Sequence, residues 1–390
     1  MRLAFVVQRY GSEVAGGAEA LCRSTARALA DRGHAVDVYT TTARDYLSWA
    51  PHFAPGTSVD GGVSVHRFPA DPPDPERSAA LVRRLALGAG DAEAEAAWAR
   101  AQGPVAPGML AALAAAVAAG RHETVSLWTY LYATTQLAMP LVAGRSVLVP
   151  LAHDEPMLRF ALTRGLVRMA RGLAFMTPEE RRLVDDLHGV GGREEAIVGA
   201  GLDPAPPGDA SRARAARALP ERFVLYLGRL DPAKGIDALV RAHGRYRSEG
   251  GPLGLVLVGR PTVDMDLPGW VHTTGFVDEA TRADLLDACE VVALPSPHES
   301  LSLVALEAWR ARRPTLATAR SEVLAGQTAR SGGGLLYDDA ATYGRQLGRL
   351  SGDPVLRAEL GAAGHAWAGG WTWDACAARW EDLLERVGRG

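Results

Sequence analysis

The sequence is short of several residue types and patterns, and each shortage excludes a class of protein. Only one of its 390 residues is a lysine, Lys234, and the three cysteines Cys22, Cys289 and Cys376 show no metal-ligand spacing. Scattered cysteines argue against a disulfide framework and fit a reducing cytoplasm. No apolar run reaches the roughly 18 residues that span a bilayer. The formal net charge of −3 gives no overall field for nucleic acid, so no nucleic-acid partner is expected.

The N-terminal segment and the overall composition predict a cytoplasmic, two-domain protein. Residues 1–8 predict a strand rather than a signal peptide, because their apolar stretch is short and no small-residue cleavage site follows. Hydrophobic residues make up 47% of the chain, which suits a buried core. A chain of 390 residues exceeds the size of one ordinary domain, so two domains are expected.

Strand and helix patterns alternate along the chain, which predicts an α/β fold. In the first half, apolar runs of strand length at 3–8, 35–41 and 63–68 are separated by loops and helical patterns. A Pro- and Gly-rich stretch within 199–220 interrupts the alternation, which restarts at 223–227. Two such runs predict two doubly wound parallel sheets. We expect the ligand beyond the carboxyl ends of the strands, in the cleft between the two domains.

The linker sets the expected domain boundaries. We place an N-terminal domain at 1–203 and a C-terminal domain at 204–370. Two tryptophans, Trp371 and Trp373, precede a helical pattern and suggest docking onto an apolar surface. A helix at about 371–388 is therefore expected to pack back on the N-terminal domain.

The single lysine lies in a turn of the type that binds phosphate. The turn Gly228-Arg229-Leu230-Asp231-Pro232-Ala233-Lys234-Gly235 follows an apolar strand and precedes a helical pattern. Glycine-bracketed turns between strand and helix are anion sites in α/β proteins. Arginine offers a planar fork and lysine a compact point charge, which together suit a diphosphate held from two sides. The alternative is that the position of the lysine has no meaning.

A second glycine turn joins the first strand to the first helix. Gly16 and Gly17 lie in Glu13-Val14-Ala15-Gly16-Gly17-Ala18-Glu19. Glycine allows close approach of the backbone to a ligand, and the helix N-terminus presents free N–H groups to an anion. The alternative is a tight turn without a ligand.

Two glutamates eight residues apart form the strongest pattern. Glu299 lies in the loop after the strand 291–294, and Glu307 lies inside the following helical pattern. A loop plus about one helical turn separates them, so both carboxylates can face one cleft at different depths. Carboxylates accept pairs of hydroxyl hydrogen bonds, which makes them natural ligands of sugars and ribose. A solvated helix residue is the alternative for Glu307, although its neighbours are apolar and a glutamate there needs partners.

These motifs together resemble those of the retaining GT-B glycosyltransferases, family 4, over essentially the whole chain. The resemblance rests on Gly228-Arg229 with Lys234-Gly235, on Glu299 with Glu307, and on further motifs in the expected order. Those further motifs are Gly16-Gly17, His153-Asp154, Val258-Gly259, Gly275-Phe276-Val277 and Gly332–Tyr337. The resemblance implies two facing Rossmann-like domains with a cleft between them. The C-terminal domain is implied to bind a nucleotide-sugar donor of the UDP or GDP type, and the N-terminal domain an acceptor.

The resemblance also implies a role for each motif residue. Arg229 and Lys234 would bind the donor diphosphate and stabilise the departing nucleoside diphosphate, so no metal or other cofactor is expected. Glu307 would hold the ribose hydroxyls and Glu299 the hydroxyls of the transferred sugar. His153 would lie against the donor sugar, near its reacting carbon. The implied donor loops also include Gly16, Gly17, Gly228, Ser300, Leu301, Ser302 and Leu303.

The chain departs from the family pattern in one loop. Family members commonly have Glu-Gly-Phe-Gly where this chain has Glu299-Ser300-Leu301-Ser302. The two serines add hydroxyl groups, so the donor sugar does not follow from the resemblance. The acceptor hydroxyl is equally open, and a glycan, a lipid-linked saccharide or a small molecule would each fit.

Two other functions are alternatives to sugar transfer, and one further motif resembles a metal site. A nucleotide-sugar epimerase would need acid and base side chains around the second carbon of the sugar, and no separate set is evident. A non-catalytic sugar-nucleotide-binding protein would not need all four of the charged residues at 229, 234, 299 and 307. Asp264-Met265-Asp266 looks like the metal-binding Asp-x-Asp of another glycosyltransferase fold, but its loop position predicts a chance match.

A basic segment of the N-terminal half suggests a membrane surface. Arg159, Arg164, Arg168 and Arg171 fall in one expected helical segment with several apolar residues. A basic amphipathic helix can rest on an anionic membrane. The alternative is an ordinary surface helix.

Overall fold

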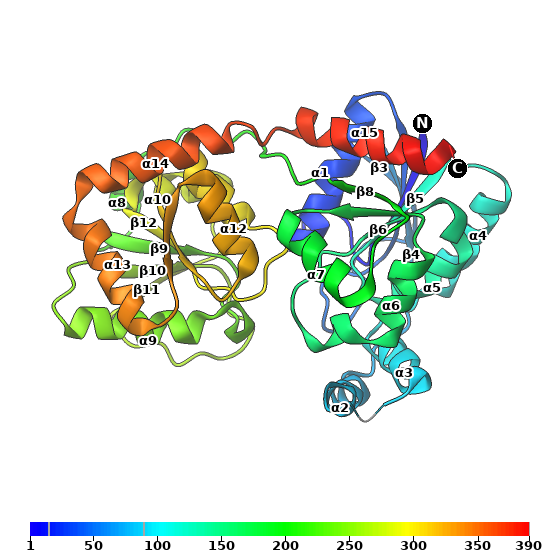
Figure 1. Ribbon diagram of the computed structural model, residues 1–390, viewed down its shortest axis with the longest axis horizontal. Helices are drawn as coiled ribbons and strands as arrows, with labels where there is room; N and C mark the ends of the chain where they lie inside the picture. The colour runs from blue at the N-terminus through cyan, green and yellow to red at the C-terminus, as the bar shows by residue number, and fades with distance from the viewer. Residues whose placement is uncertain (15, 89, 390) are drawn as a thin grey trace. The chain divides into compact units, whose positions relative to one another are not determined.

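The computed structural model describes residues 1–14, 16–88 and 90–389. The chain forms two compact units. Unit 1 comprises Met1–Gly201 and the segment from Trp373 onward, and unit 2 comprises Leu202–Thr372. Each unit is built around one sheet, coloured blue to green in unit 1 and green to orange in unit 2 (Figure 1).

The sheet of unit 1 has eight strands in the order β3-β4-β2-β1-β5-β6-β7-β8. All neighbours are parallel except β3 and β4, which pair antiparallel. The order reverses between β1 and β5, which makes the carboxyl ends of these two strands the switch point of the sheet. The strands are β1 (Arg2–Val6), β2 (Ala35–Thr41), β3 (Gly56–Asp60), β4 (Val63–Phe68), β5 (Thr124–Trp128), β6 (Ser146–Val149), β7 (Gly172–Phe175) and β8 (Glu194–Ile197).

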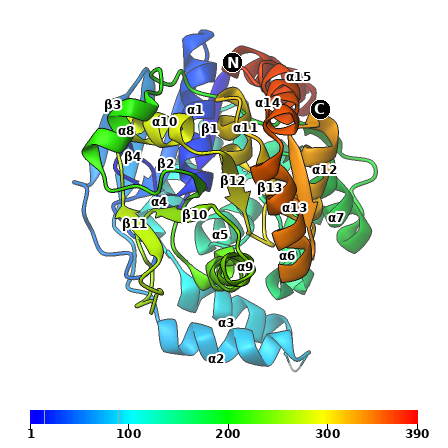
Figure 2. The same cartoon turned by 90° about the vertical axis from the view of Figure 1, so that its left-hand side faces the viewer.

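The helices of unit 1 connect and cover these strands. Most carry recognisable start signals, such as Asp74, Asp91 and Thr177 as side-chain N-caps. Helices α2 and α3 lie side by side as a hairpin (Figure 2). The helices are α1 (Gly17–Asp31), α2 (Pro75–Ala86), α3 (Ala92–Gln102), α4 (Pro107–Ala118), α5 (Ala133–Val142), η1 (Ala143–Arg145), η2 (Pro156–Arg159), α6 (Ala161–Met169), α7 (Pro178–His188) and α15 (Trp373–Arg389).

Helix α15 completes the core of unit 1 although it follows unit 2 in the chain. Its Trp380 is fully buried and stacks on Trp128 of β5, with ring centroids 5.8 Å apart. Phe5 of β1 packs against both rings. Arg32, just after α1, forms ion pairs with Asp374 and Glu381 of α15. The helix therefore packs against α1, as Figure 1 shows, and is fixed by aromatic burial inside and by charge pairs outside.

The sheet of unit 2 has six strands, all parallel, in the order β11-β10-β9-β12-β13-β14. Counted from β9, this is the order 3-2-1-4-5-6 of a Rossmann fold, with its switch point between β9 and β12. Strands β9 and β12 are buried throughout, as parallel strands covered on both faces must be. The strands are β9 (Phe223–Leu227), β10 (Gly254–Val258), β11 (Val271–Gly275), β12 (Val291–Leu294), β13 (Thr315–Thr318) and β14 (Gly334–Tyr337).

The helices of unit 2 pack in pairs against this sheet. Helix α9 packs with α13 around a core that includes Ile236, Leu239 and Tyr343, while α8 packs with α10 and α11 with α14. The helices are α8 (Ala210–Ala216), η3 (Pro232–Lys234), α9 (Ile236–Ser248), α10 (Glu279–Ala288), α11 (Leu303–Arg310), α12 (Glu322–Ser331), α13 (Ala340–Gly352) and α14 (Pro354–Ala368).

The structure corrects two expectations about elements. The sheet of unit 1 is not purely parallel, because β3 forms a hairpin with β4. The four arginines at 159, 164, 168 and 171 do not share one helix. The backbone of Phe160 is extended between η2 and α6, and α6 ends at Met169.

The helices of the described ranges were compared with the length and apolar composition that a membrane span requires. Across 1–14, 16–88 and 90–389, no single helix is long and apolar enough to cross a bilayer. Helices α3 and α4 meet the length and composition criterion only jointly, with a bend of 106° between them.

Candidate active site

Lys234 and Glu299 meet at the switch point of the unit 2 sheet. Lys234 ends η3, which follows β9, and Glu299 lies in the loop after the neighbouring strand β12. The Nζ atom of Lys234 is 2.9 Å from Oε1 of Glu299 and 3.5 Å from the carbonyl oxygen of His298. Both side chains are mainly buried, with 30% and 18% of their surfaces exposed. The predicted phosphate ligand and the predicted sugar ligand are therefore direct neighbours.

A glycine makes this approach possible. Gly235 has φ +77°, in the left-handed region, and a Cβ atom there would lie 2.4 Å from the carbonyl oxygen of Pro295. Only glycine fits a left-handed position so close to another backbone. Asp231 fixes the other end of the turn, because its carboxylate accepts the N–H of Ala233 at 2.9 Å. The close packing of the two loops thus places Lys234 over Glu299.

Gly228 and Arg229 form the exposed rim of the same turn. Both residues are exposed at the carboxyl end of β9. The hydroxyl of Tyr226 donates to the carbonyl oxygen of Arg229 at 2.8 Å and holds this part of the backbone. Burial, followed by the nearby Glu299 carboxylate, raises the pKa of Tyr226, which keeps it a neutral donor. The guanidinium of Arg229 is therefore presented on a fixed backbone.

The serine loop before α11 is used partly by the fold itself. Ser302 is the N-cap of α11, and its hydroxyl accepts the N–H of Ala305 at 3.2 Å. Its own N–H donates to Gln327 at 2.9 Å. Leu301 is buried and Leu303 begins the helix, while Ser300 is half-buried. Ser302 therefore stands where the resembled family commonly has glycine, and its hydroxyl caps α11.

Glu307 forms an ion pair with Arg282 of α10, separate from the Lys234 pair. The Glu307 side chain is 18% exposed, and burial raises its pKa although Arg282 opposes the shift. Both residues line a pocket of about 480 Å³ between α10, α11 and the segment 202–208. The two glutamates of the motif thus belong to different ion pairs, Glu299 with Lys234 and Glu307 with Arg282. Their spacing alone had not distinguished these two surroundings.

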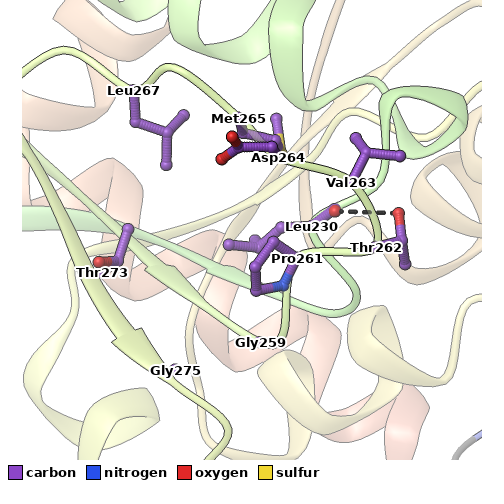
Figure 3. Close-up of a pocket in the computed structure, with 10 residues that line it drawn as sticks. All are labelled: Leu230, Gly259, Pro261, Thr262, Val263, Asp264, Met265, Leu267, Thr273 and Gly275. Atoms are coloured by element: carbon purple, nitrogen blue, oxygen red, sulfur yellow. Dashed lines mark hydrogen bonds between the residues drawn. The ribbon is translucent and has the colours of Figure 1, made fainter.

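A second pocket of unit 2 has a volume of about 440 Å³ and lies between the loop after β10 and strand β11 (Figure 3). Leu230 of the turn after β9 forms one wall, and the Thr262 hydroxyl donates to its carbonyl oxygen at 3.3 Å. Asp264 and Met265 line the opposite side. Within the described ranges, no group of three or more His, Cys, Asp or Glu side chains is placed to hold a metal ion.

His153 lies in unit 1, in the loop that follows β6. Its Nδ1 atom is 3.4 Å from Oε1 of Glu155, and the His153 side chain is 27% exposed. The buried Tyr130, which follows β5, donates its hydroxyl to the same Glu155 oxygen. Asp154 turns outward to pair with Arg159 at 2.5 Å. The carboxylate facing the histidine ring is therefore Glu155, rather than the Asp154 of the motif.

The Gly16-Gly17 turn covers a buried charge cluster at the carboxyl end of β1. Arg9 and Glu19 form an ion pair with both side chains about 95% buried, and Gln8 donates to Glu19 at 2.8 Å. A Cβ atom at Gly16 would lie 2.1 Å from the Glu19 carboxylate, whereas one at Gly17 would meet nothing within 4 Å. Gly16 is therefore required by packing and Gly17 leaves an open surface. Ala15, in the middle of the predicted turn, lies outside the described residues.

Sequence reasoning did not find the partners of these residues. Arg282 and Glu155 each contact a predicted site residue, and Tyr130 contacts Glu155. Arg282 and Tyr130 each lie 25 positions in the chain from the residue that they contact. Glu155 had a local signal, because it is two residues from His153. For Arg282 the only signal was indirect. Glu307 lies among apolar neighbours, and a glutamate in such surroundings needs a partner.

Comparison with known proteins gives a consistent picture. Residues 221–353 match the family model described as "Glycosyl transferases group 1". A protein of Stackebrandtia nassauensis named D-inositol 3-phosphate glycosyltransferase is 31% identical and covers 98% of this chain and 88% of its own length. A relative of the same name from Xylanimonas cellulosilytica is 30% identical, with 97% and 93% covered.

Solved structures agree on the fold. Sucrose-phosphate synthase from Thermosynechococcus elongatus superposes with a TM-score of 0.73 at 20% identity, covering 99% of this chain and 98% of that structure. The Anabaena protein HepE in complex with UDP-glucose gives 0.68 at 17% identity, with 100% of both chains covered. These likenesses and the two Rossmann-like sheets confirm the expected GT-B fold.

Proposed function

This chain belongs to the glycosyl transferases group 1, and we propose that it moves a sugar from a nucleoside-diphosphate sugar to an acceptor hydroxyl with retention of anomeric configuration. The observation that carries the proposal is the Lys234–Glu299 pair, which joins a cation and a carboxylate at the switch point of a Rossmann sheet. Ligands of open α/β sheets bind at that point. A diphosphate needs the cation and a sugar needs the carboxylate, so the pair suits a donor that contains both.

In this proposal unit 2 binds the donor. Arg229 and Lys234 hold the diphosphate from two sides, and Glu299 accepts hydroxyls of the transferred sugar. Glu307 holds the ribose, which requires its carboxylate to be shared with or released by Arg282. The loop of Ser300, Leu301, Ser302 and Leu303 covers the sugar from the N-terminal end of α11.

In this proposal unit 1 binds the acceptor. His153 contacts the donor sugar near its reacting carbon, with Glu155 orienting its imidazole. The open surface at Gly17 admits the donor diphosphate or the acceptor. The acceptors to be tested in turn are a small molecule, a glycan and a lipid-linked saccharide.

The chemistry proposed needs no metal ion. Cleavage of the sugar–phosphate bond leaves negative charge on the phosphate, and the fixed cations of Arg229 and Lys234 stabilise that charge. The departing phosphate then takes the proton of the acceptor hydroxyl on the same face of the sugar. Retention follows from attack on the face that the leaving group vacates.

The donor is identified by a thermal-shift screen over nucleoside diphosphates and their sugar conjugates. Bound ligand stabilises the native state by mass action, so the true nucleotide raises Tm more than the others. UDP and UDP-glucose are tested first, because they are the ligands of the HepE structures, and GDP conjugates second. The stabilising donor is then incubated with acceptors, and the anomeric configuration of the product is read by NMR. An inverted product, or activity that is lost with EDTA and restored by a divalent cation, would contradict the proposal.

We also propose peripheral contact with an anionic membrane, supported by the exposed arginines around α6. Arg159, Arg164, Arg168 and Arg171 are all exposed, while Leu166 and other apolar residues of α6 face the core. Contact through this surface would be electrostatic, and Arg159 contributes least because it pairs with Asp154. Sedimentation with phosphatidylglycerol vesicles, with phosphatidylcholine vesicles as control, tests it. Equal binding of a variant with Arg164 and Arg168 changed to glutamine would argue against it.

A further inference from the structure

We propose that Glu180 is a positioning residue for the transfer reaction, acting through the backbone of the loop that carries His153. This inference rests on the role proposed above for His153. Glu180 belongs to α7, which follows β7, and His153 belongs to the loop after the adjacent parallel strand β6. The Glu180 residue is only 1% exposed, so its carboxylate has no access to the acceptor or donor and does not act on them directly.

The carboxylate is held by backbone N–H groups from two loops. Its Oε1 accepts the N–H of Ala152 at 2.7 Å and its Oε2 accepts the N–H of Met176 at 2.6 Å. Burial outweighs these hydrogen bonds and raises the pKa of Glu180 to about 8, so the carboxyl group is mostly protonated at neutral pH. Glu180 therefore ties the loop after β6 to the start of α7. Its attachment point in that loop, Ala152, is one residue before His153.

The local sequence of α7 explains only part of this arrangement. Thr177 is the N-cap and accepts the N–H of Glu180 at 3.2 Å, so Thr177-Pro178-Glu179-Glu180 has the residues of a capping box. In a capping box the glutamate returns to the N-cap N–H. Here it accepts the N–H of Met176, one position earlier, and reaches the neighbouring loop with its other oxygen. The side chain at the capping-box position therefore also joins two loops.

The loop itself has a conformation that needs such an anchor. Leu151 has φ +51°, in the left-handed region that non-glycine residues seldom adopt. The N–H of Ala152, the next residue, donates to Glu180, so the buried carboxyl group holds the backbone directly after the left-handed residue. The turn that presents His153 therefore depends on the carboxyl group of Glu180.

Two further groups lie in the same region. Tyr130 is buried, and burial, followed by the charges of Glu155 and Glu180, raises its pKa. Tyr130 donates to Glu155, which faces the imidazole of His153. Glu180 thus holds the backbone of the loop, while Tyr130 holds the Glu155 carboxylate 3.4 Å from the His153 imidazole. A small shift at a reacting group costs much in rate, so loss of the backbone anchor should lower kcat more than it changes substrate affinity.

The test combines kinetics with hydrogen exchange on the full chain. Glu180→Gln places an amide N–H2 against the backbone donors, and kcat should fall by on the order of 10–10²-fold with a change in donor KM of less than about threefold. In a His153→Ala background the same change should cost less than about twofold, because Glu180 acts through His153. Asp186→Asn, an exposed acid on the same helix, is the matched control and should leave kcat unchanged. An undiminished kcat in Glu180→Gln, or an equal loss with and without His153, would overturn the proposal.

Hydrogen exchange separates this inference from the proposed function. The amides of Ala152 and Met176 should exchange faster in Glu180→Gln and not in Asp186→Asn, and unchanged protection would overturn the role of Glu180 whatever the kinetics show. If His153→Ala keeps full kcat, the role proposed for His153 is wrong, and exchange alone decides whether Glu180 holds the loop. If Glu180→Gln does not fold, Glu180→Asp keeps the carboxyl group but shortens its reach by one methylene. That variant should show a lower kcat near the native Tm, and full kcat would again contradict the proposal.

Discussion

The ammonium of Lys234 lies 2.9 Å from the carboxylate of Glu299, so two residues proposed to hold different parts of the donor form an ion pair with each other. A partly buried charge without a partner is costly. The pair therefore keeps the cation ready at the switch point, and a donor diphosphate would take over the compensation. Each residue limits the freedom of the other, because Lys234 is held between Glu299 and the carbonyl of His298.

Removing the Lys234 cation should slow the chemical step. We expect Lys234→Ala to lower kcat by on the order of 10²–10³-fold, because one fixed charge that stabilises the departing diphosphate is lost. Steady-state kinetics with the donor found by thermal shift measures this. Arg241→Ala, which removes an exposed cation from α9, is the control and should be neutral. Near-normal turnover in Lys234→Ala would remove Lys234 from the mechanism.

The uniqueness of Lys234 makes it chemically addressable. It is the only side-chain amine among the 390 residues, and 30% of it is exposed. We expect an amine-directed acylating reagent to abolish most activity and the matching nucleoside diphosphate to slow this loss, because acylation removes the charge. A Lys234→Arg variant has no side-chain amine, so its residual activity should survive the same treatment. Equal inactivation of both proteins would show that the reagent acts elsewhere.

Loss of the Glu307 carboxylate should weaken nucleotide binding. We expect Glu307→Ala to raise the Kd for the free nucleoside diphosphate by roughly 10–100-fold, as hydrogen bonds to a charged group contribute about 1.5–3 kcal/mol. Titration calorimetry measures the affinity. Glu359→Ala, an exposed glutamate of α14, serves as the control. Unchanged affinity in Glu307→Ala would exclude the ribose role.

His243 should make the stability of unit 2 depend on pH. It is fully buried, its Nδ1 is 2.9 Å from the Tyr343 hydroxyl and its Nε2 is 3.0 Å from the Leu253 carbonyl oxygen. Burial lowers the pKa of His243 to about 4, from an ordinary value of 6.5. The native state then binds fewer protons than the unfolded state between these values. Stability from this group is therefore complete above pH 6.5 and is lost as the pH falls towards 4, by up to roughly 3 kcal/mol.

Denaturant unfolding at several pH values checks this sign. His243→Gln keeps a hydrogen-bonding side chain but does not titrate, so its free energy of unfolding should change less than that of the native sequence between pH 6.5 and 4. The same slope in both proteins would assign the acid sensitivity to other groups.

The attachment of α15 should be a main source of stability in unit 1. Trp380 is fully buried against Trp128 and Phe5, so Trp380→Ala should lower the free energy of unfolding by about 3–5 kcal/mol. Glu385→Ala, on the exposed face of the same helix, removes only an exposed pair with Arg389 and should cost less than about 0.5 kcal/mol. Chemical denaturation of both variants measures the difference. Similar losses for the two variants would show that α15 adds little through its buried face.

The predictable parts of the fold and site are those encoded in continuous sequence. Strand β9 and the turn with Lys234 were found because an apolar run, a glycine pair and a helical pattern follow one another directly. The motif of Glu299 and Glu307 has the same local character. In contrast, the partnership of Glu307 with Arg282 spans 25 residues and two helices, so no local pattern reports it.

Some of the elements that the sequence did not predict depend on tertiary packing. Helix α5 contains Pro140 and two adjacent threonines, Thr134 and Thr135, all poor helix formers, and forms because its side chains are buried against the sheet. Strand β3 is short, mostly exposed and without an apolar alternation, so it exists only through its pairing with β4. The hydrogen bond from Ala152 to Glu180 is likewise visible only once β6 and β7 are neighbours.

The placement of α15 also sets an order of events during synthesis. Unit 2 is one continuous stretch, Leu202–Thr372, whereas unit 1 is interrupted by it and needs Trp373–Arg389 to bury Phe5 and Trp128. On the ribosome, every residue of unit 2 has been made before the residues that finish unit 1. Unit 2 can therefore fold while unit 1, begun first, still exposes a strip of its apolar surface. A nascent chain of this enzyme is expected to need protection at its older end, and to lose that need when α15 emerges.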